Sequence, residues 1–191
     1  DQIQTHPTVH PERSTMITEA VRGNGAILVN REGQRFVDEM GTRDVVSAAI
    51  LDQEGQTVFL VFDDGIRASL AAIESYRRQG IVTEGATVED LGAALGMDVL
   101  SLAAALEQYN AAGEAGVDDA YGRGDLPRSL ETGPFYAIEI SPSVHHTMGG
   151  VRIDAKSEVQ GEDGSIPGLY AAGELTGGIH GGNRLGGNAL A

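Results

Sequence analysis

Cysteine is absent from the 191-residue sequence. Without cysteine the chain can form no disulfide, no thiolate metal site and, within this stretch, no covalent attachment to a c-type haem. Long apolar runs are absent as well, since none approaches the roughly 20 residues that a membrane-spanning helix needs. The first residues, DQIQ, do not have the pattern of a signal peptide. The sequence therefore predicts no membrane-spanning segment.

Basic residues are few: 13 lysines and arginines stand against 28 aspartates and glutamates, which gives a formal net charge of -15. A surface of this charge repels nucleic acid and anionic membranes, so neither is an expected partner. An anionic substrate is also repelled at long range, so a site for one must depend on local arginine and histidine side chains. A chain of this length can bury a core and suits one domain, or one and part of another.

The stretch TEAVRGNGAILVNREGQRFVDEMGTRD, residues 18–44, combines arginines and acids around an expected turn. The sequence NREG at 30–33 separates an apolar run from an alternating run, which predicts a β-hairpin. Such a hairpin would bring Arg22 close to Arg43, which begins an expected helix through Leu51. Arginines beside a helix N-terminus favour an anion. From the residues alone, a surface hairpin with ordinary salt bridges is the alternative.

The remaining patterns predict a mixed α+β fold. Strands are expected at 57–63 and 135–140, and helices at 66–78, after Thr87 and at 99–112, followed by a loop at 113–124. The acids of this loop lack the spacing of a calcium site, and no metal site is expected.

A glycine-rich segment, GGIHGGNRLGGN at 177–188, follows an expected strand at 168–174. Glycines let backbone amides approach a planar or anionic group closely, so the segment is a general anion loop or a cofactor loop. The glycine fingerprint of a dinucleotide-binding βαβ unit occurs nowhere in the chain.

Long motifs carry a more specific signal than these short patterns. They are TEAVRGNGAILVNREGQRFVDE with the following TRD, HPT at 6–8, FYAIEISPSVHHTMGGVRID at 135–154 and PGLYAAGELTGGIHGGNRLGGNAL at 167–190. Together they resemble the flavin-dependent fumarate reductases of the flavocytochrome c type, within the fumarate reductase and succinate dehydrogenase flavoprotein family. The resemblance covers most of the chain and is weakest between about Ser69 and Leu126.

The resemblance implies that the chain is a fragment of a longer flavoprotein. Residues 1–8 are then a remnant of an FAD-binding domain, 9–141 a cap domain that closes over the substrate, and 142–191 the truncated C-terminal segment of the FAD-binding domain. Hinges are expected near His10-Pro11 and Pro142-Ser143. Because the dinucleotide fingerprint is missing, we expect the isolated chain to lack tightly bound FAD and to be inactive.

The resemblance also implies the chemistry of the parent protein. Fumarate, or a similar dicarboxylate, is reduced to succinate by hydride from the reduced flavin of FAD, and an arginine at the position of Arg43 donates the proton. That donor is reprotonated through Arg22 and Glu19. The substrate-binding residues are His6, Thr18, His145 and Arg184, with His146 structural, and those near FAD are Glu174, Gly187, Asn188, Ala189 and Leu190.

Two other interpretations stay open. The same flavoenzyme scaffold could act on another unsaturated acid, such as a urocanate-like compound, or on a 3-ketosteroid. Alternatively, the chain could be a binding module without a cofactor. The electron donor of the parent protein is not identified by the sequence.

Overall fold

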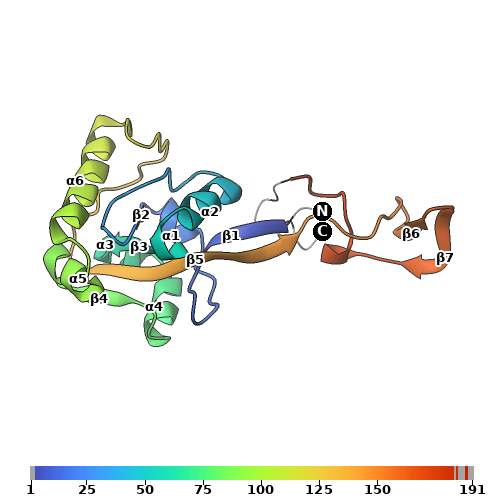
Figure 1. Cartoon of the computed structure of the whole chain (residues 1–191), viewed down its shortest axis with the longest axis horizontal. Helices are drawn as coiled ribbons and strands as arrows, with labels where there is room; N and C mark the ends of the chain where they lie inside the picture. Colours follow the sequence, from blue (N-terminus) through green and yellow to red (C-terminus); the bar gives the residue numbers. More distant parts are fainter. Residues whose placement is uncertain (1–2, 183, 185–187, 189–191) are drawn as a thin grey trace. The chain divides into compact units, whose positions relative to one another are not determined.

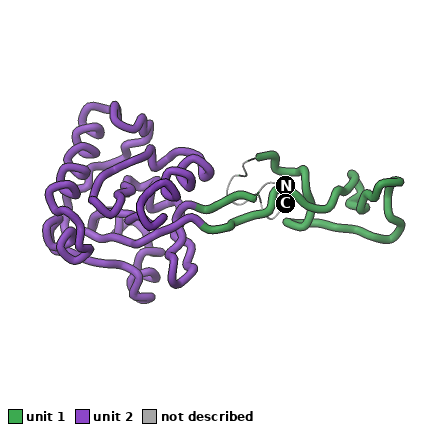
Figure 2. The backbone as a smooth tube through the Cα atoms, viewed as in Figure 1, with its two compact units in different colours: residues 1–6, 143–191 green, residues 7–142 purple. Residues whose placement is uncertain are grey.

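The computed structural model describes residues 3–182, 184 and 188 (Figure 1). The chain forms two compact units, 7–142 and 1–6 with 143–191 (Figure 2). It passes from one to the other within β1 (Ile3–Val9) and again within β5 (Phe135–Thr147). The assignment of these parts to a cap and an FAD-binding domain, and hinge motion between them, remain predictions. None of the helices in the described ranges is long and apolar enough to cross a bilayer.

The main sheet has the strand order β1-β5-β3-β2, and the short β4 (Thr83–Gly85) also pairs with β5. β2 (Ile27–Val29) and β3 (Val58–Asp63) are antiparallel, and Leu60 of β3 lies opposite Ile138 of β5. Every residue of β2 and β3 is buried. Strands that are apolar on both sides need cover on both faces, as the continuous apolar run at 57–63 predicted.

Helices occupy much of the remainder of the 7–142 unit. They are α1 (Ala20–Gly23), α2 (Arg43–Leu51), the 3-10 turn η1 (Glu54–Gln56), α3 (Asp64–Ser69), α4 (Ala71–Arg78), α5 (Val88–Leu95) and α6 (Val99–Ala115). Figure 1 shows α5 and α6 gathered where β5 begins. Thr87 and Asp98 cap these two helices by accepting hydrogen bonds from the Asp90 and Leu100 N–H groups, as expected for such residues at N-caps.

The single helix expected over 66–78 is instead two helices, α3 and α4. The break lies at Leu70, whose φ of -129° and ψ of 101° are extended. Leu70 packs against the hydrophobic core from this position. Apolar spacing continues across the break, which is why periodicity alone predicted one helix.

The turn at 30–33 forms, but the second strand of the expected hairpin does not. The Gly33 N–H donates to the Asn30 carbonyl at 3.0 Å, and Val29 and Arg35 form one isolated bridge. Beyond the bridge the chain leaves the sheet, because the side chains of Arg35 and Glu39 are both buried against one another. Gly33 has a φ of +82°, and a Cβ there would lie 2.9 Å from the Leu102 nitrogen in α6. Glycine is therefore required at this position.

The other unit contains a two-stranded antiparallel ladder of β6 (Glu158–Gly161) and β7 (Gly164–Tyr170). The expected strand at 168–174 thus ends early, and a 3-10 turn, η2 (Gly173–Leu175), follows it. All residues of β7 are exposed. A Cβ on Gly150 would lie 2.2 Å from the Leu175 carbonyl oxygen, so these two backbones touch with no room for a side chain.

Candidate functional site

Glu19 and Arg43 form a bidentate ion pair in the 7–142 unit. Arg43 opens α2, and its Nε and Nη2 donate to Glu19 Oε1 at 2.7 Å and Oε2 at 3.0 Å. The Arg43 side chain is 11% exposed and that of Glu19 is 42% exposed. Paired, charge-assisted contacts of this kind fix the plane of the guanidinium. The structure therefore brings these two predicted residues together, with the carboxylate reaching solvent.

Arg22 lies behind this pair, on the one-turn helix α1. Its Nη2 is 3.7 Å from Glu19 Oε1, and its Nη1 donates to the main-chain oxygen of Glu39 at 2.6 Å. The residue is only 4% exposed. Burial lowers the pKa of the Arg22 guanidinium, and the nearby positive charge of Arg43 lowers it further, against the raising effect of Glu19. Arg22 is thus a cation that loses its proton more readily than an exposed arginine.

Thr18 immediately precedes this group in the chain. Its main-chain N–H donates to the Tyr76 hydroxyl oxygen at 3.0 Å, and its Oγ1 accepts a longer contact, 3.4 Å, from the Ala20 N–H. The first contact ties the entry to α1 to helix α4, and the second places the hydroxyl at the start of α1. The structure therefore gathers Thr18, Glu19, Arg22 and Arg43 in one unit.

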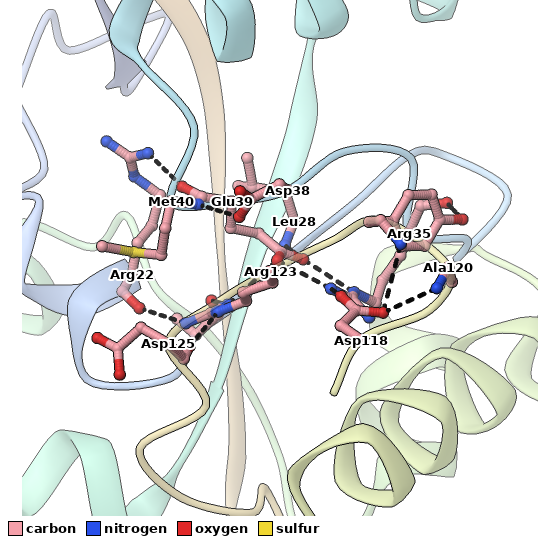
Figure 3. A network of polar contacts seen from close by, with 12 residues as sticks. Arg22, Leu28, Arg35, Asp38, Glu39, Met40, Asp118, Ala120, Arg123 and Asp125 are labelled. Carbon is pink, nitrogen blue, oxygen red and sulfur yellow. Dashed lines mark hydrogen bonds and ion pairs between the residues drawn. The ribbon is translucent and has the colours of Figure 1, made fainter. Parts of the chain in front are cut away.

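A buried ion-pair cluster adjoins Arg22, and Figure 3 shows its labelled side chains joined by polar contacts. The carboxylate of Glu39 accepts from Arg35 Nε at 2.9 Å and from Arg123 Nη1 at 3.1 Å. Arg35 also donates to Asp118 at 2.8 Å. Burial acts to lower the Arg35 pKa, but its bonds to Glu39 and Asp118 outweigh burial and raise it. The cluster therefore pairs two buried arginines with two buried carboxyl groups.

The sequence patterns do not single out this cluster. Arg35 and Glu39 are four residues apart, so in an extended strand their side chains point to the same side, a signal that could have marked the pair. Arg123 lies in a glycine-containing loop without periodicity, and nothing local relates it to residues about 100 positions earlier. Only the fold makes that contact visible.

Two of the predicted substrate residues, His6 and His145, are neighbours in the other unit. Their ring centroids are 5.2 Å apart, with His6 on β1 and His145 on β5. His6 is 3% exposed and His145 is half-buried. His146, on the opposite side of the extended strand, is buried and lies edge-on to His180 at 5.6 Å.

Arg184 is buried, and its main-chain oxygen accepts a hydrogen bond from Gln4 Nε2 at 2.9 Å. Asn188 is exposed. The other three residues expected near the flavin, Gly187, Ala189 and Leu190, lie outside the described residues. In the described ranges, no group of three or more histidine, aspartate or glutamate residues is arranged to hold a metal ion.

The described residues around Glu174 fit one edge of a flavin site. The Glu174 carboxylate accepts from the Thr147 N–H at 2.9 Å and stays 51% exposed. That hydrogen bond, with the nearby charges of His146 and Arg184, lowers its pKa. An ionised, accessible carboxylate is the group that accepts hydrogen bonds from sugar hydroxyls of a nucleotide cofactor.

Comparisons with known proteins show the family of the chain. The family model described as FAD binding domain matches residues 1–190. The chain is 52% identical over 189 residues to a fumarate reductase (cytochrome) of Shewanella frigidimarina, covering 98% of this chain and 33% of that protein. It is 50% identical over 192 residues to an NADH:fumarate oxidoreductase of Klebsiella pneumoniae, covering 100% of this chain and 21% of that protein.

A solved structure is similar to a large part of the chain. It is the solution NMR structure of a fumarate reductase flavoprotein subunit from Lactobacillus plantarum, with a TM-score of 0.55 and 25% identity, covering 69% of this chain and 92% of that chain. The chain spans a third or less of the length of the two curated relatives above. FAD is the cofactor of the parent protein. The two curated relatives above are named as enzymes that act on fumarate. The chain belongs to the FAD binding domain family.

Proposed function

We propose that the full-length protein is an FAD-dependent fumarate reductase that converts fumarate, or a closely similar dicarboxylate, to succinate. The observation that carries this proposal is the bidentate Glu19–Arg43 pair with Arg22 behind it. It occurs in a chain about half identical to proteins named as acting on fumarate. The comparisons do not favour another unsaturated acid, a 3-ketosteroid or a cofactor-free module. The electron donor stays unidentified.

Arg43 is the proposed proton donor. FAD, when bound and in its reduced form, would supply a hydride to one alkene carbon, and the electron pair of the double bond would move to the other carbon and its carboxylate. That carbon then takes a proton to complete succinate. A guanidinium is a weak acid, but a carbanion-like carbon is a strong base, so a donor already in contact can protonate it. A cation at this position also stabilises the developing negative charge.

Glu19 and Arg22 are the proposed route by which Arg43 regains its proton. Both oxygens of Glu19 accept from Arg43, so a proton lost there can be replaced along these hydrogen bonds. Glu19 is itself 42% exposed and can exchange with solvent. The lowered pKa of Arg22 makes it a better proton source than an exposed arginine.

Four side chains are the proposed ligands of the dicarboxylate: His6, Thr18, His145 and Arg184. Imidazolium and guanidinium groups form charge-assisted hydrogen bonds to carboxylates. Such local cations are required because the chain as a whole carries a net charge of -15. The neighbouring rings of His6 and His145 suit the binding of one carboxylate by two donors.

The test of this function is Arg43→Ala in the full-length, FAD-loaded protein. Loss of a general acid costs about 100-fold or more, so the rate at which fumarate reoxidises the reduced flavin should fall by at least that factor while FAD stays bound. Arg78→Ala, which removes an exposed arginine at the end of α4, should leave that rate unchanged.

Arg43→Lys separates proton donation from a purely electrostatic role. Lysine keeps the positive charge but cannot form the two-pronged contact with Glu19. A lysine ammonium is a stronger acid than a guanidinium, so if the side chain at position 43 donates the proton, kcat of Arg43→Lys should begin to fall at a lower pH than that of the wild type. Activity that is retained with an unchanged pH profile would indicate that water supplies the proton, and the donor role would be rejected. Near-normal turnover in Arg43→Ala would reject the proposed function of this pair altogether.

A further inference from the structure

We propose that Glu39 and Arg123 are positioning residues that hold the Arg22 guanidinium beside Glu19. The proposal rests on the proposed function, in which Arg22 passes protons toward Arg43. It adds two residues that contact neither substrate nor cofactor and that act through Arg22.

Glu39 binds the side chain of Arg22, and Arg123 binds its main chain. Its side chain donates from Nη1 to the main-chain oxygen of Glu39 at 2.6 Å. Its own main-chain oxygen accepts from Arg123 Nη2 at 2.8 Å. Arg22 Nε is buried and makes no hydrogen bond among the described residues. The bond to Glu39 is therefore the main polar contact that fixes the direction of the guanidinium toward Glu19.

Arg123 also stabilises a helix too short to hold its own shape. α1 has four residues, and a single helical turn is unfavourable without outside contacts. Arg123 Nη1 donates to the Ala26 oxygen at 2.9 Å and to Glu39 Oε2 at 3.1 Å, and its Nε donates to the Asp125 oxygen at 2.8 Å. One planar guanidinium thus joins the end of α1, the start of β2 and the Glu39 carboxylate.

Glu39 connects Arg22 and Arg123 to the sheet; we call the pair of Glu39 and Arg123 the clamp. Its side chain is fully buried, and besides the two arginines it accepts from the Leu28 N–H of β2 at 3.3 Å. Arg35 binds both of its oxygens, at 2.9 and 3.0 Å. Since β2 lies in the buried sheet, the main-chain oxygen that binds Arg22 is tied to that sheet through the Glu39 side chain.

The charges of the cluster balance, which suits a positioning role. Arg35 and Arg123 are matched by Glu39 and Asp118. The cluster therefore adds no net charge to the neighbouring group of Glu19, Arg22 and Arg43. A positioning device of this kind can fix geometry without changing the electrostatic balance of a proton route.

Arg123→Lys in the full-length, FAD-loaded protein tests the proposal. Lysine keeps the charge, but one ammonium cannot reproduce four directed bonds. A displacement of about 1 Å near a reacting group can cost about 100-fold in rate. We expect kcat to fall by about that factor while the fumarate KM changes less than about twofold, because the ligands of the substrate are untouched. Arg78→Lys is the matched control on the surface.

Two further measurements separate positioning from general destabilisation. With reprotonation slowed, kcat of Arg123→Lys should decline more steeply with rising pH than that of the wild type. In an Arg22→Lys background, Arg123→Lys should add little further loss, since the residue that it positions is already replaced. Glu39→Gln, which keeps the shape of the side chain, serves as the second variant and should show the same non-additivity.

The outcomes are distinguishable from failure of the proposed function. Unchanged kcat in both variants overturns the inference, as does a loss that multiplies in the Arg22→Lys background. If Arg43→Ala keeps its activity, the proposed function fails first, whatever Arg123→Lys does. Loss in Arg43→Ala with normal kcat in Arg123→Lys and Glu39→Gln removes only the positioning role.

Discussion

Asp118 is a buried acid of the 7–142 unit that forms an ion pair with Arg35. It is 3% exposed and accepts from Arg35 Nη2 at 2.8 Å and from the Ala120 and Tyr121 N–H groups at 3.3 and 3.4 Å. Burial acts to raise its pKa, but these hydrogen bonds outweigh burial and lower it. A carboxyl whose pKa is lower in the folded than in the unfolded state stabilises the fold above its unfolded pKa.

Asp118→Asn should therefore destabilise the chain in a pH-dependent way. Breaking one member of a buried ion pair costs about 3 kcal/mol or more at neutral pH. The difference in unfolding free energy from the wild type should shrink below about pH 4, where the unfolded carboxyl is protonated, and urea denaturation at pH 7 and pH 3.5 measures it. Asp119→Asn, at the neighbouring exposed acid, should change stability little. A pH-independent difference would contradict the role of ionisation.

At the same scale, sequence analysis could find some members of the candidate site but not their supports. Arg22 and Arg43 were expected to approach because a turn separates them, and both contact Glu19. Glu39 and Arg123 were missed because they meet only through the tertiary fold. Glu39 lies within the motif at 18–39, but the motif does not show which of its residues meet, and Arg123 lies outside every motif of the resemblance.

β4 and α5 touch through a glycine, and this contact fixes how the helix lies on the sheet. A Cβ on Gly85 would lie 2.2 Å from the Leu91 nitrogen and 2.6 Å from its Cα. Gly85 also lies opposite Phe135 in the ladder between β4 and β5. Backbone against backbone leaves no side chain that could move aside.

Gly85→Ala should push α5 off the sheet and destabilise the chain by about 1–3 kcal/mol, as overpacking does elsewhere. Gly113→Ala is the matched change in α6, where a Cβ would meet nothing within 4 Å. It should be neutral or stabilise the chain by up to about 1 kcal/mol through helix propensity. Thermal unfolding of both variants measures the contrast. Equal effects would show that the close approach at Gly85 is not what limits this position.

Among the elements, those with a local signal were predicted well. Helix α2 was expected from the residues that follow the turn, and strand β3 from its continuous apolar run. Helices α5 and α6 were expected from the residues that cap their N-termini. The break at Leu70 and the missing second strand after Gly33 were not predicted. In both places tertiary packing overrides a periodic pattern, once through a leucine and once through the buried Arg35–Glu39 pair.

At the scale of the whole molecule, the two units differ in how much apolar surface they bury. The 7–142 unit has a continuous core of aliphatic and aromatic side chains. In the other unit, Leu169, Tyr170 and Leu175 are 48%, 60% and 61% exposed. At these three positions the unit keeps apolar side chains in contact with solvent.

The isolated chain should bind no FAD tightly. Glu174 is proposed to form only one edge of the cofactor site, and no dinucleotide fingerprint is present in the sequence to bind the pyrophosphate. Titration of FAD with the chain should leave flavin fluorescence unquenched at micromolar concentrations. A yellow complex with one FAD per chain would overturn this expectation, and the full-length protein is the positive control.

The atom of Glu39 that accepts from Arg22 belongs to the main chain, and almost any amino acid could supply the same oxygen. What this acid contributes is the course of the backbone, which its carboxylate anchors to two arginines and a strand. A different set of side chains could therefore hold Arg22 in the same way, provided that the backbone of the loop follows the same path. Annotation transfer keyed to residue identity would overlook such replacements, while superposition of loop backbones would find them.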